Sequence, residues 1–313
     1  MRASVQPLLF LPNSGWNLCR HPRLALPESV NRRLLIAIMK TMFASRLPKY
    51  ACLFVLAACL QTAGADETAG FPSPGEGKLI HFDPALPPVS NRAPGIDYSF
   101  NLPQESFEIF VPRNYSDKEA FGVFAFMDSG DSMTMPKEWA AIMEKEKLIC
   151  LIPQKIGNDQ PFSRRVGLTL IGILKTVERY KADPRRIYTG GLSGGARCSL
   201  QLAFLHNDVI AGNISICGAN FYEPVPKVHD TEKSDYGVWP VPPDRIAAAK
   251  GKVRFVFITG ARDFRYGKIL DIYEGGFVKN GFQARLIDQT NMGHQMCSPE
   301  SLLEAFHFVS GGR

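Results

Sequence analysis

The chain has 313 residues, 45% of them hydrophobic and 21% charged, which is the composition of a globular protein and excludes a disordered chain. Its net charge of +6 comes from the N-terminal part of the chain. Residues 1–65 hold eight of the 36 basic residues and one of the 30 acidic residues, so the remainder carries 28 basic and 29 acidic residues. Because that remainder has no excess of basic residues, we expect no nucleic-acid partner.

Residues 39–65 have the pattern of a secretory signal peptide. Basic residues are followed by an apolar run over 51–60 and then by Ala63 and Ala65, the small residues of a cleavage site. The apolar run is much shorter than the roughly 20 residues that span a bilayer, although a buried helix or a membrane anchor is an alternative. We therefore expect a secreted or periplasmic protein that starts near Asp66 and has no stable membrane insertion after processing.

Two further features of the front of the chain bear on processing. The sequence Leu-Ala-Ala-Cys, which ends at Cys59, resembles a lipobox, so a lipoprotein attached at Cys59 is an alternative to full secretion. Residues 1–38 precede the signal and have no clear period. We expect the true start at Met39 or Met42 and interpret 1–38 as a non-native or disordered extension.

The rest of the chain divides into a linker or loosely packed arm over 66–94, which is rich in Pro, Gly and Ser, and one domain over 95–313. Strand and helix patterns alternate in the domain, apart from an insertion over 218–245. The continuous apolar runs over 121–127 and 148–153 are typical of strands buried on both faces. The alternation predicts an alpha/beta fold with a mostly parallel, doubly wound sheet and helices on both faces. We expect strands over 105–112, 121–127, 148–153, 186–190, 212–218, 252–260 and 282–288, and helices over 136–147, 167–183, 195–206, 266–281 and 298–310.

Four cysteines lie beyond the signal: Cys150, Cys198, Cys217 and Cys297. They would allow two disulfides in three pairings, but they are far apart in sequence and three of them lie in apolar runs. We expect mostly buried thiols with at most one bridge. The chain has no CxxC pair and no histidine-rich cluster, so we expect no metal and no cofactor.

A glycine-rich segment, Gly191-Leu192-Ser193-Gly194-Gly195, lies between the strand over 186–190 and the helix that follows. G-x-S-x-G in this position is the pattern of a nucleophile elbow, whose turn is so tight that the residues two before and two after the serine must be small. The serine then stands on a strained turn at a helix N-terminus, whose N–H groups favour developing negative charge. We interpret Ser193 as a nucleophile; the alternative is a turn that only packs the helix onto the sheet.

The segment over 182–196, "ADPRRIYTGGLSGGA", resembles the elbow of alpha/beta-hydrolases related to secreted polyhydroxyalkanoate depolymerases and feruloyl esterases. The segment over 107–127 is similar to the strands that precede the elbow in that family. The resemblance covers roughly residues 105–310 and is most specific at the elbow. It implies the alpha/beta-hydrolase fold, and it implies an acid in a G-x-x-D loop and a histidine in a G-H loop.

The partners of the serine follow from chemistry and chain order. A serine hydroxyl needs a histidine to take its proton, and the histidine needs a carboxylate; in this fold class the order is Ser, then acid, then His. Asp263 and His294 lie in loops that follow the strands over 252–260 and 282–288. We predict a triad of Ser193, Asp263 and His294. For the acid, the alternatives are that Asp263 is a surface residue paired with Arg262 or Arg265, or that Asp271 or Asp288 takes its place. For the histidine, the alternative is that His294 is an ordinary loop residue; the other candidates are His81, His206, His229 and His307.

An oxyanion hole needs two N–H donors. We expect the first from Gly194 and the second from Ser129 or Gly130, in the loop after the strand over 121–127. Members of the family usually carry His-Gly there, whereas this chain has Asp128. We expect Asp128 to shape the loop by bonding nearby backbone N–H groups and to turn away from Ser193.

The predicted function is a secreted serine esterase that cleaves a small-molecule or polymeric carboxylic ester through an acyl-enzyme. Aromatic residues of the insertion, Phe221, Tyr222, Tyr236 and Trp239, lie where they would stack on a substrate, and the first, second and last are our candidates for substrate binding. The alternative is that they fill a small satellite core. The alternative functions are a serine peptidase of the same fold and a catalytically impaired binding module.

Overall fold

The computed structural model describes residues 70–231 and 238–312. The predicted extension 1–38, the predicted signal peptide 39–65 and the insertion residue Tyr236 lie outside the described residues. Among the helices of the described part, none is both long enough and apolar enough to cross a membrane.

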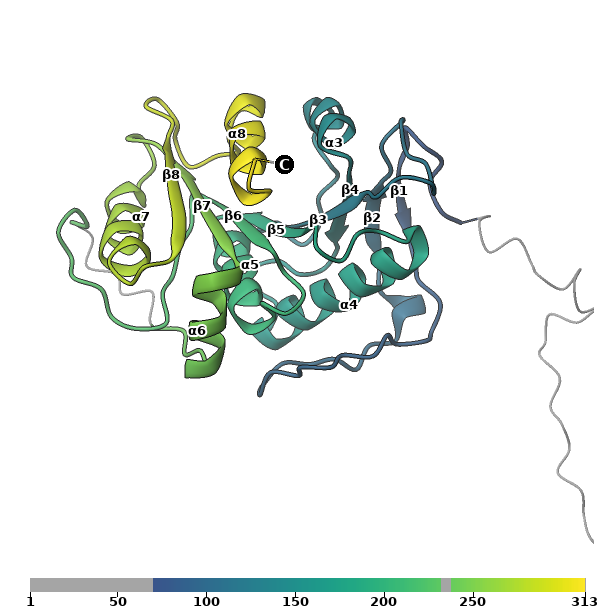
Figure 1. The fold of residues 1–313 in the computed structure, drawn as a ribbon, viewed down its shortest axis with the longest axis horizontal. Helices are drawn as coiled ribbons and strands as arrows, with labels where there is room; N and C mark the ends of the chain where they lie inside the picture. The colour runs from purple at the N-terminus through teal and green to yellow at the C-terminus, as the bar shows by residue number, and fades with distance from the viewer. Residues whose placement is uncertain (1–69, 232–237, 313) are drawn as a thin grey trace, which may run out of the picture. The chain divides into compact units, whose positions relative to one another are not determined.

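A single mixed sheet crosses the described part of the chain in the strand order β1-β2-β4-β3-β5-β6-β7-β8 (Figure 1). Strands β3 to β8 pair in parallel, whereas β1 pairs antiparallel with β2, and β2 with β4. The predicted mostly parallel sheet is therefore confirmed. The strands are β1 (Gly77–Ile80), β2 (Phe107–Phe110), β3 (Gly122–Met127), β4 (Leu148–Pro153), β5 (Ile187–Leu192), β6 (Gly212–Ile216), β7 (Arg254–Thr259) and β8 (Gln283–Asp288).

Helices cover both faces of the sheet, as the doubly wound prediction requires (Figure 1). Helices α3 and α8 lie over one face, and α4 to α7 contribute to the core on the other. The helices are η2 (Lys137–Trp139) leading into α3 (Ala140–Glu146), α4 (Phe162–Tyr180), α5 (Gly194–Leu205), α6 (Pro243–Lys252), α7 (Tyr266–Asp271) continuing as the π-helix η3 (Ile272–Val278), and α8 (Pro299–Val309), with a short 3-10 turn η1 (Leu102–Gln104) before β2.

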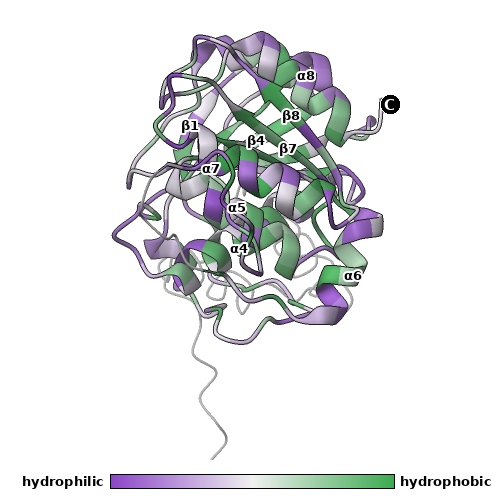
Figure 2. Ribbon diagram, turned by 90° about the vertical axis from the view of Figure 1, so that its left-hand side faces the viewer, coloured by the Kyte–Doolittle hydropathy of each residue, from purple (hydrophilic) through white to green (hydrophobic). Residues whose placement is uncertain are grey.

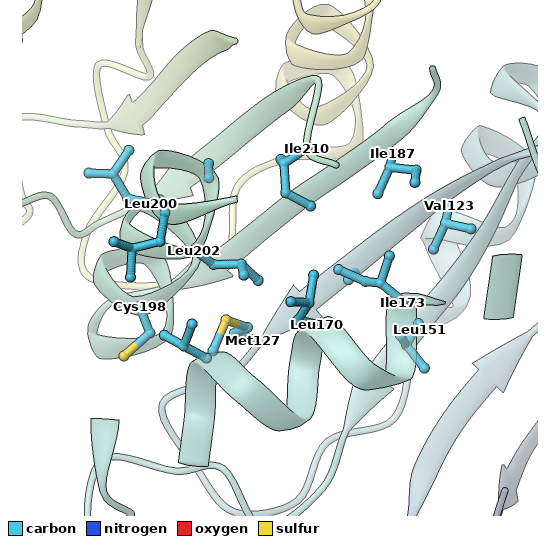
Figure 3. Packing of buried hydrophobic residues seen from close by; sticks show 14 of the residues in the cluster. Val123, Met127, Leu151, Leu170, Ile173, Ile187, Cys198, Leu200, Leu202 and Ile210 are labelled. Atoms are coloured by element: carbon cyan, nitrogen blue, oxygen red, sulfur yellow. The ribbon is translucent and has the colours of Figure 1, made fainter. Parts of the chain in front are cut away.

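Strand β3 explains why the core has two halves. Successive side chains of a strand point to opposite faces, so Val123 and Ala125 join the cluster under α4 and α5, while Phe124 and Phe126 join the cluster under α3 and α8. Figure 2 shows the hydrophobic colour concentrated in interior strands such as β4 and β7. Figure 3 shows the first cluster, where side chains of α4 such as Leu170 meet those of the sheet.

The prediction of a linker over 66–94 is wrong from Gly70 onward, where the chain is an arm that packs on the domain. Strand β1 pairs with β2, and Ile80 and Phe82 are buried. The Lys175 ammonium of α4 lies 2.9 Å from the Asp83 carboxylate, which ties this arm to the helix. A four-residue strand is too short to give a periodic signal, and its partner strand is distant in sequence.

Two other boundaries differ from the sequence prediction. Helix α6 begins at Pro243 inside the predicted insertion, with proline at a helix N-terminus where its missing N–H is not needed. The helix predicted over 266–281 changes to a π-helix at Ile272. The four cysteines of the domain, Cys150, Cys198, Cys217 and Cys297, are buried and free, so the one bridge that we allowed for is not formed.

Candidate active site

The turn between β5 and α5 holds Ser193 in a strained backbone, with φ of 57° and ψ of −114°. Glycine is required on both sides of it. A Cβ on Gly191 would lie 2.5 Å from the carbonyl carbon of Gly195, and a Cβ on Gly195 would lie 1.9 Å from the carbonyl oxygen of Met127. This close approach of helix to strand presents Ser193 at the carboxyl end of the parallel strands.

A chain of hydrogen bonds links the three residues predicted to form the triad. Ser193 Oγ lies 2.8 Å from His294 Nε2, and His294 Nδ1 lies 2.8 Å from Asp263 Oδ1. Because an ionised carboxylate only accepts, His294 donates from Nδ1, which leaves Nε2 free to accept the serine proton. Asp263 is buried, and its carboxylate also accepts bonds from the Thr259 hydroxyl at 2.9 Å and the Arg265 N–H at 3.0 Å.

The loops that carry Asp263 and His294 are joined directly. Arg262 forms an isolated parallel bridge with Gly293. Beneath them, the thiol of Cys217 donates to the carbonyl oxygens of Gly293 at 3.5 Å and Gln295 at 3.4 Å. Burial, helped by the nearby Asp263 charge, raises the pKa of this thiol, so it stays a neutral donor. Nothing in the sequence pattern pointed to Cys217 as a support for the histidine loop.

The rival residues have other partners. The Asp271 carboxylate accepts three backbone N–H bonds from residues 228–230, and Asp288 accepts the Tyr266 hydroxyl. The rival histidines bond Glu105 (His81), Tyr98 (His206), Glu274 (His229) and Glu146 (His307).

The loop after β3 agrees in part with the predicted oxyanion hole. As expected, the carboxylate of Asp128 bonds its own loop, accepting the N–H of Gly130 at 2.9 Å. That bond engages the N–H that we had assigned to the oxyanion, so the expectation for Gly130 is wrong. The carbonyl oxygen of Ser129 accepts the N–H of Asn158 at 2.9 Å, and Gly194 is the first residue of α5.

Asn158 is a site residue that the sequence analysis missed. A Cβ on Gly194 would lie 1.9 Å from Asn158 Oδ1, so the amide rests directly against the residue after the serine. Buried Arg165 donates to Asn158 Oδ1 from Nη1 at 3.3 Å, to the Asp128 carbonyl at 3.3 Å and to the Ile156 carbonyl at 2.7 Å. Arg165 therefore fixes the two loops that face the elbow.

A cavity of about 300 Å³ opens beside Ser193. Trp239, one of the three candidates for substrate binding, lines it. Phe221 and Tyr222 do not: Phe221 is buried in the large hydrophobic core with its ring 5.1 Å from that of Phe277, and the partly buried Tyr222 packs against that core with its ring 5.9 Å from that of Phe204. The two residues therefore belong to the main core, not to the separate satellite core that was the alternative. The residues that line the cavity are Asn158, Gln160, Phe162, Arg165, Ser193, Gly194, Arg197, Cys198, Trp239 and Arg265.

One group of potential metal ligands among the described residues coincides with this site. Ligand atoms of Cys217, Asp263 and His294 lie within 4.8 Å of one another. Each of them already takes part in the hydrogen bonds described above. We therefore interpret the group as one hydrogen-bonded network.

No protein-family model and no curated protein sequence matches the chain. Solved structures do match. A ferulic acid esterase has a TM-score of 0.53 at 14% identity, over 77% of this chain and 100% of its own. The S-formylglutathione hydrolase of Staphylococcus aureus has a TM-score of 0.54 at 13% identity, over 75% and 98%. The acylaminoacyl peptidase of Pyrococcus horikoshii has a TM-score of 0.51 at 14% identity, over 77% of this chain and 42% of its own. At such identities the likeness bears on the fold, and together with the strand order it identifies the chain as a protein with the alpha/beta-hydrolase fold.

Proposed function

We propose that the protein is a serine hydrolase that cleaves carboxylic esters through an acyl-enzyme. The observation that carries the proposal is the unbroken hydrogen-bond chain from Ser193 through His294 to Asp263, two contacts of 2.8 Å that begin at a strained elbow. A buried carboxylate, an oriented imidazole and a serine at a helix N-terminus are the parts that acyl transfer requires.

The proposed reaction starts when Ser193 Oγ attacks the ester carbonyl carbon and His294 Nε2 takes its proton. Asp263 stabilises the imidazolium that results and keeps Nδ1 protonated. The tetrahedral intermediate expels the alcohol, to which His294 returns the proton, and leaves an acyl group on Ser193. A water molecule activated by the same histidine then releases the acid.

The negative oxygen of the intermediate needs donors on the side of α5. The Gly194 N–H lies at the start of that helix, where backbone N–H groups have no helical partner. We assign the second donor to the Ser129 N–H, and we add the side-chain amide of Asn158, which rests against Gly194. Arg165 holds Asn158 by its oxygen, which leaves the Nδ2 hydrogens available.

An organophosphonate probe tests the proposal. It should label Ser193 of the folded protein, and Ser193→Ala should lose both labelling and ester hydrolysis, with a rate loss on the order of 10⁴-fold or more. Ser310→Ala, a substitution at the end of α8, is the matched control and should keep both. A folded Ser193→Ala protein with near-normal turnover would refute the proposal.

A second function, peptide hydrolysis, would use the same residues. The peptidase among the similar structures is more than twice as long as the part that this chain matches, because the match covers 42% of it. Comparing an aryl ester with the anilide of the same acid separates the two functions. Rapid anilide cleavage without ester cleavage would favour a peptidase, and a protein that cleaves neither and takes up no probe would be a binding module.

The proposal also includes export to a secreted or periplasmic location, with a mature protein starting near Asp66. N-terminal sequencing of the protein from its source tests this. A chain recovered from the cytoplasm with Met1 intact would refute export, and a lipid on Cys59 would select the lipoprotein alternative.

A further inference from the structure

The residue that follows the acid of the proposed triad is an exposed phenylalanine. Phe264 is 55% exposed, and among the described residues it is the one phenylalanine, tyrosine or tryptophan that is neither buried nor half-buried. Its ring nevertheless contacts the histidine of the triad: the centres of the Phe264 and His294 rings lie 4.3 Å apart, with an angle of 40° between the ring planes. A large apolar side chain that stays exposed beside a reactive group is a candidate contact for a ligand.

A tight turn built on Asp263 fixes the position of Phe264. The Asp263 carboxylate accepts the N–H of Arg265 at 3.0 Å, and the Asp263 carbonyl accepts the N–H of Tyr266 at 2.9 Å. Phe264 lies inside this turn, and bonds of this kind from an aspartate side chain stiffen a turn. The guanidinium carbon of Arg265 also lies 4.8 Å from the centre of the Phe264 ring. The acid that orients His294 therefore also holds the Phe264 ring beside it.

The path of the proton places the alcohol part of an ester at this ring. In the proposed reaction His294 Nε2 passes the serine proton to the departing alcohol, so the alcohol oxygen must come within hydrogen-bond distance of Nε2. The atoms bonded to that oxygen then lie next to the imidazole, where the Phe264 ring is an exposed apolar surface. Phe264 does not line the cavity that contains Trp239, which leaves that cavity for the acyl group.

We propose that Phe264 binds the alcohol part of the substrate and that the ester cleaved at Ser193 carries an apolar alcohol that contains a ring. This inference rests on the proposed hydrolase function and names the chemical class of its leaving group. A ring placed against Phe264 removes apolar surface of both partners from water and gains the attraction between two aromatic groups. A methyl alcohol gains little from the same contact, because it is too small to cover the ring.

Two esters of one acid test the proposal. Benzyl hexanoate and methyl hexanoate share their acyl group, so they differ only in the alcohol that would meet Phe264. Each kcat/KM is divided by the rate constant for hydrolysis of that ester by hydroxide, which removes the difference in intrinsic reactivity. We expect the native protein to favour the benzyl ester about 10-fold, and Phe264→Ala to lower that preference about 5-fold, as the loss of an aromatic contact predicts.

Two further variants assign the preference to the ring of Phe264. Phe264→Tyr keeps an aromatic ring and should keep most of the benzyl preference. Val278→Ala is the matched control, because Val278 is 51% exposed, ends η3 and does not line the cavity beside Ser193. Its ratio of benzyl to methyl kcat/KM should stay within about twofold of that of the native protein. Thermal unfolding shows whether each variant is folded.

Partition of the acyl-enzyme distinguishes alcohol binding from a role in supporting His294. The hexanoyl group on Ser193 can pass to water or to added benzyl alcohol, and His294 activates both. A ring that only positions His294 would change both rates alike and leave the ratio of benzyl hexanoate to hexanoic acid unaltered. If Phe264 binds the alcohol, Phe264→Ala should lower that ratio about 5-fold at a concentration of benzyl alcohol below saturation.

The outcomes separate this inference from the function on which it rests. Probe labelling at Ser193 and ester cleavage, with the same benzyl preference in the native protein and in Phe264→Ala, would overturn the alcohol site and leave the hydrolase proposal standing. Equal slowing of both esters in Phe264→Ala would also overturn it, because Phe264 would then be a positioning residue of His294. If no ester is cleaved and no probe binds, both proposals fail together.

Discussion

The side chain of Asn158 and the backbone of Gly194 occupy adjoining space, so close that a single added methyl group at Gly194 would lie 1.9 Å from Asn158 Oδ1. The residue after the serine is therefore glycine for a packing reason, and the amide of Asn158 lies beside the residue that we propose as an oxyanion donor. Because Arg165 bonds the amide oxygen, the amide nitrogen is the atom left to donate.

Replacing Asn158 by alanine should lower kcat by about 10- to 1000-fold and change KM little, as the loss of an oxyanion donor does. Asn158→Asp keeps the shape but places a carboxylate near the developing charge, so it should be slower still. Steady-state assays on a neutral aryl ester give kcat and KM, and thermal unfolding shows whether each variant is still folded. Equal rates in Asn158→Ala and the native protein would remove Asn158 from the oxyanion hole.

Asp263→Asn should lower kcat by about 10³- to 10⁴-fold, because an amide facing Nδ1 favours the tautomer whose Nε2 carries the proton. Thr259→Val should cost much less, since it removes only one of the bonds that the carboxylate accepts. Asp288→Asn is the control, because Asp288 bonds Tyr266 outside the site. A loss in Asp288→Asn as large as in Asp263→Asn would contradict the assignment.

The loop after β3 gives a prediction in which two substitutions at one position differ. Asp128→Asn should keep most activity, because its side-chain oxygen can still accept the Gly130 N–H. Asp128→Ala removes that bond, frees the loop and should slow turnover severalfold. A strong rise in activity in both variants would mean that the carboxylate opposes the reaction in the native protein.

His206 makes the stability of the domain depend on pH. Burial lowers the pKa of this histidine to about 4, and it bonds the Tyr98 hydroxyl at 2.8 Å. Between pH 6.5 and 4 the unfolded chain therefore binds a proton that the folded chain does not, so stability falls as the pH falls through this window. From pH 7 to pH 4.5 this single group should remove roughly 2 to 3 kcal/mol from the free energy of unfolding.

Urea unfolding of the native protein and of His206→Gln at both pH values measures that effect. The glutamine variant has no titrating group at this position, so its stability should fall less over the same interval. The quantity to compare is the decrease in the free energy of unfolding between the two pH values, in the native protein and in the variant. The comparison does not depend on how stable the variant is at pH 7. Equal falls in both proteins would refute a neutral, buried His206.

Local signals were enough to predict the elbow and the order of its partners. Glycines at fixed spacing around Ser193 reflect a turn geometry that the sequence itself imposes. Asp263 follows a strand with a clear apolar run, and His294 follows a segment with a strand pattern. The mostly parallel sheet and the helices on both of its faces followed from the alternation of strand and helix patterns. Each of these depends on neighbours within about ten residues in the chain.

The features that the sequence analysis missed depend on contacts between residues that lie far apart in the sequence. Strand β1 exists because β2 offers it an edge, and Arg165, Arg197 and Arg265 meet only once α4, α5 and the loop after β7 are in place. The aromatic residues of the insertion look alike in sequence, yet Trp239 lines the cavity while Phe221 packs in the core. Their positions along the sequence do not indicate which residue lines the cavity and which one packs in the core.

The described part of the chain contains four free cysteines that are buried, and their reaction with a thiol reagent can measure local opening of the domain. Cys150 lies within the packed interior on strand β4, and Cys217 lies beneath the histidine loop. A thiol reagent can react with either only when the surrounding structure opens, so its reaction rate measures local opening. Faster labelling of Cys217 than of Cys150 would reveal that the histidine loop opens without the interior, and in an oxidising environment the same closed packing protects both thiols.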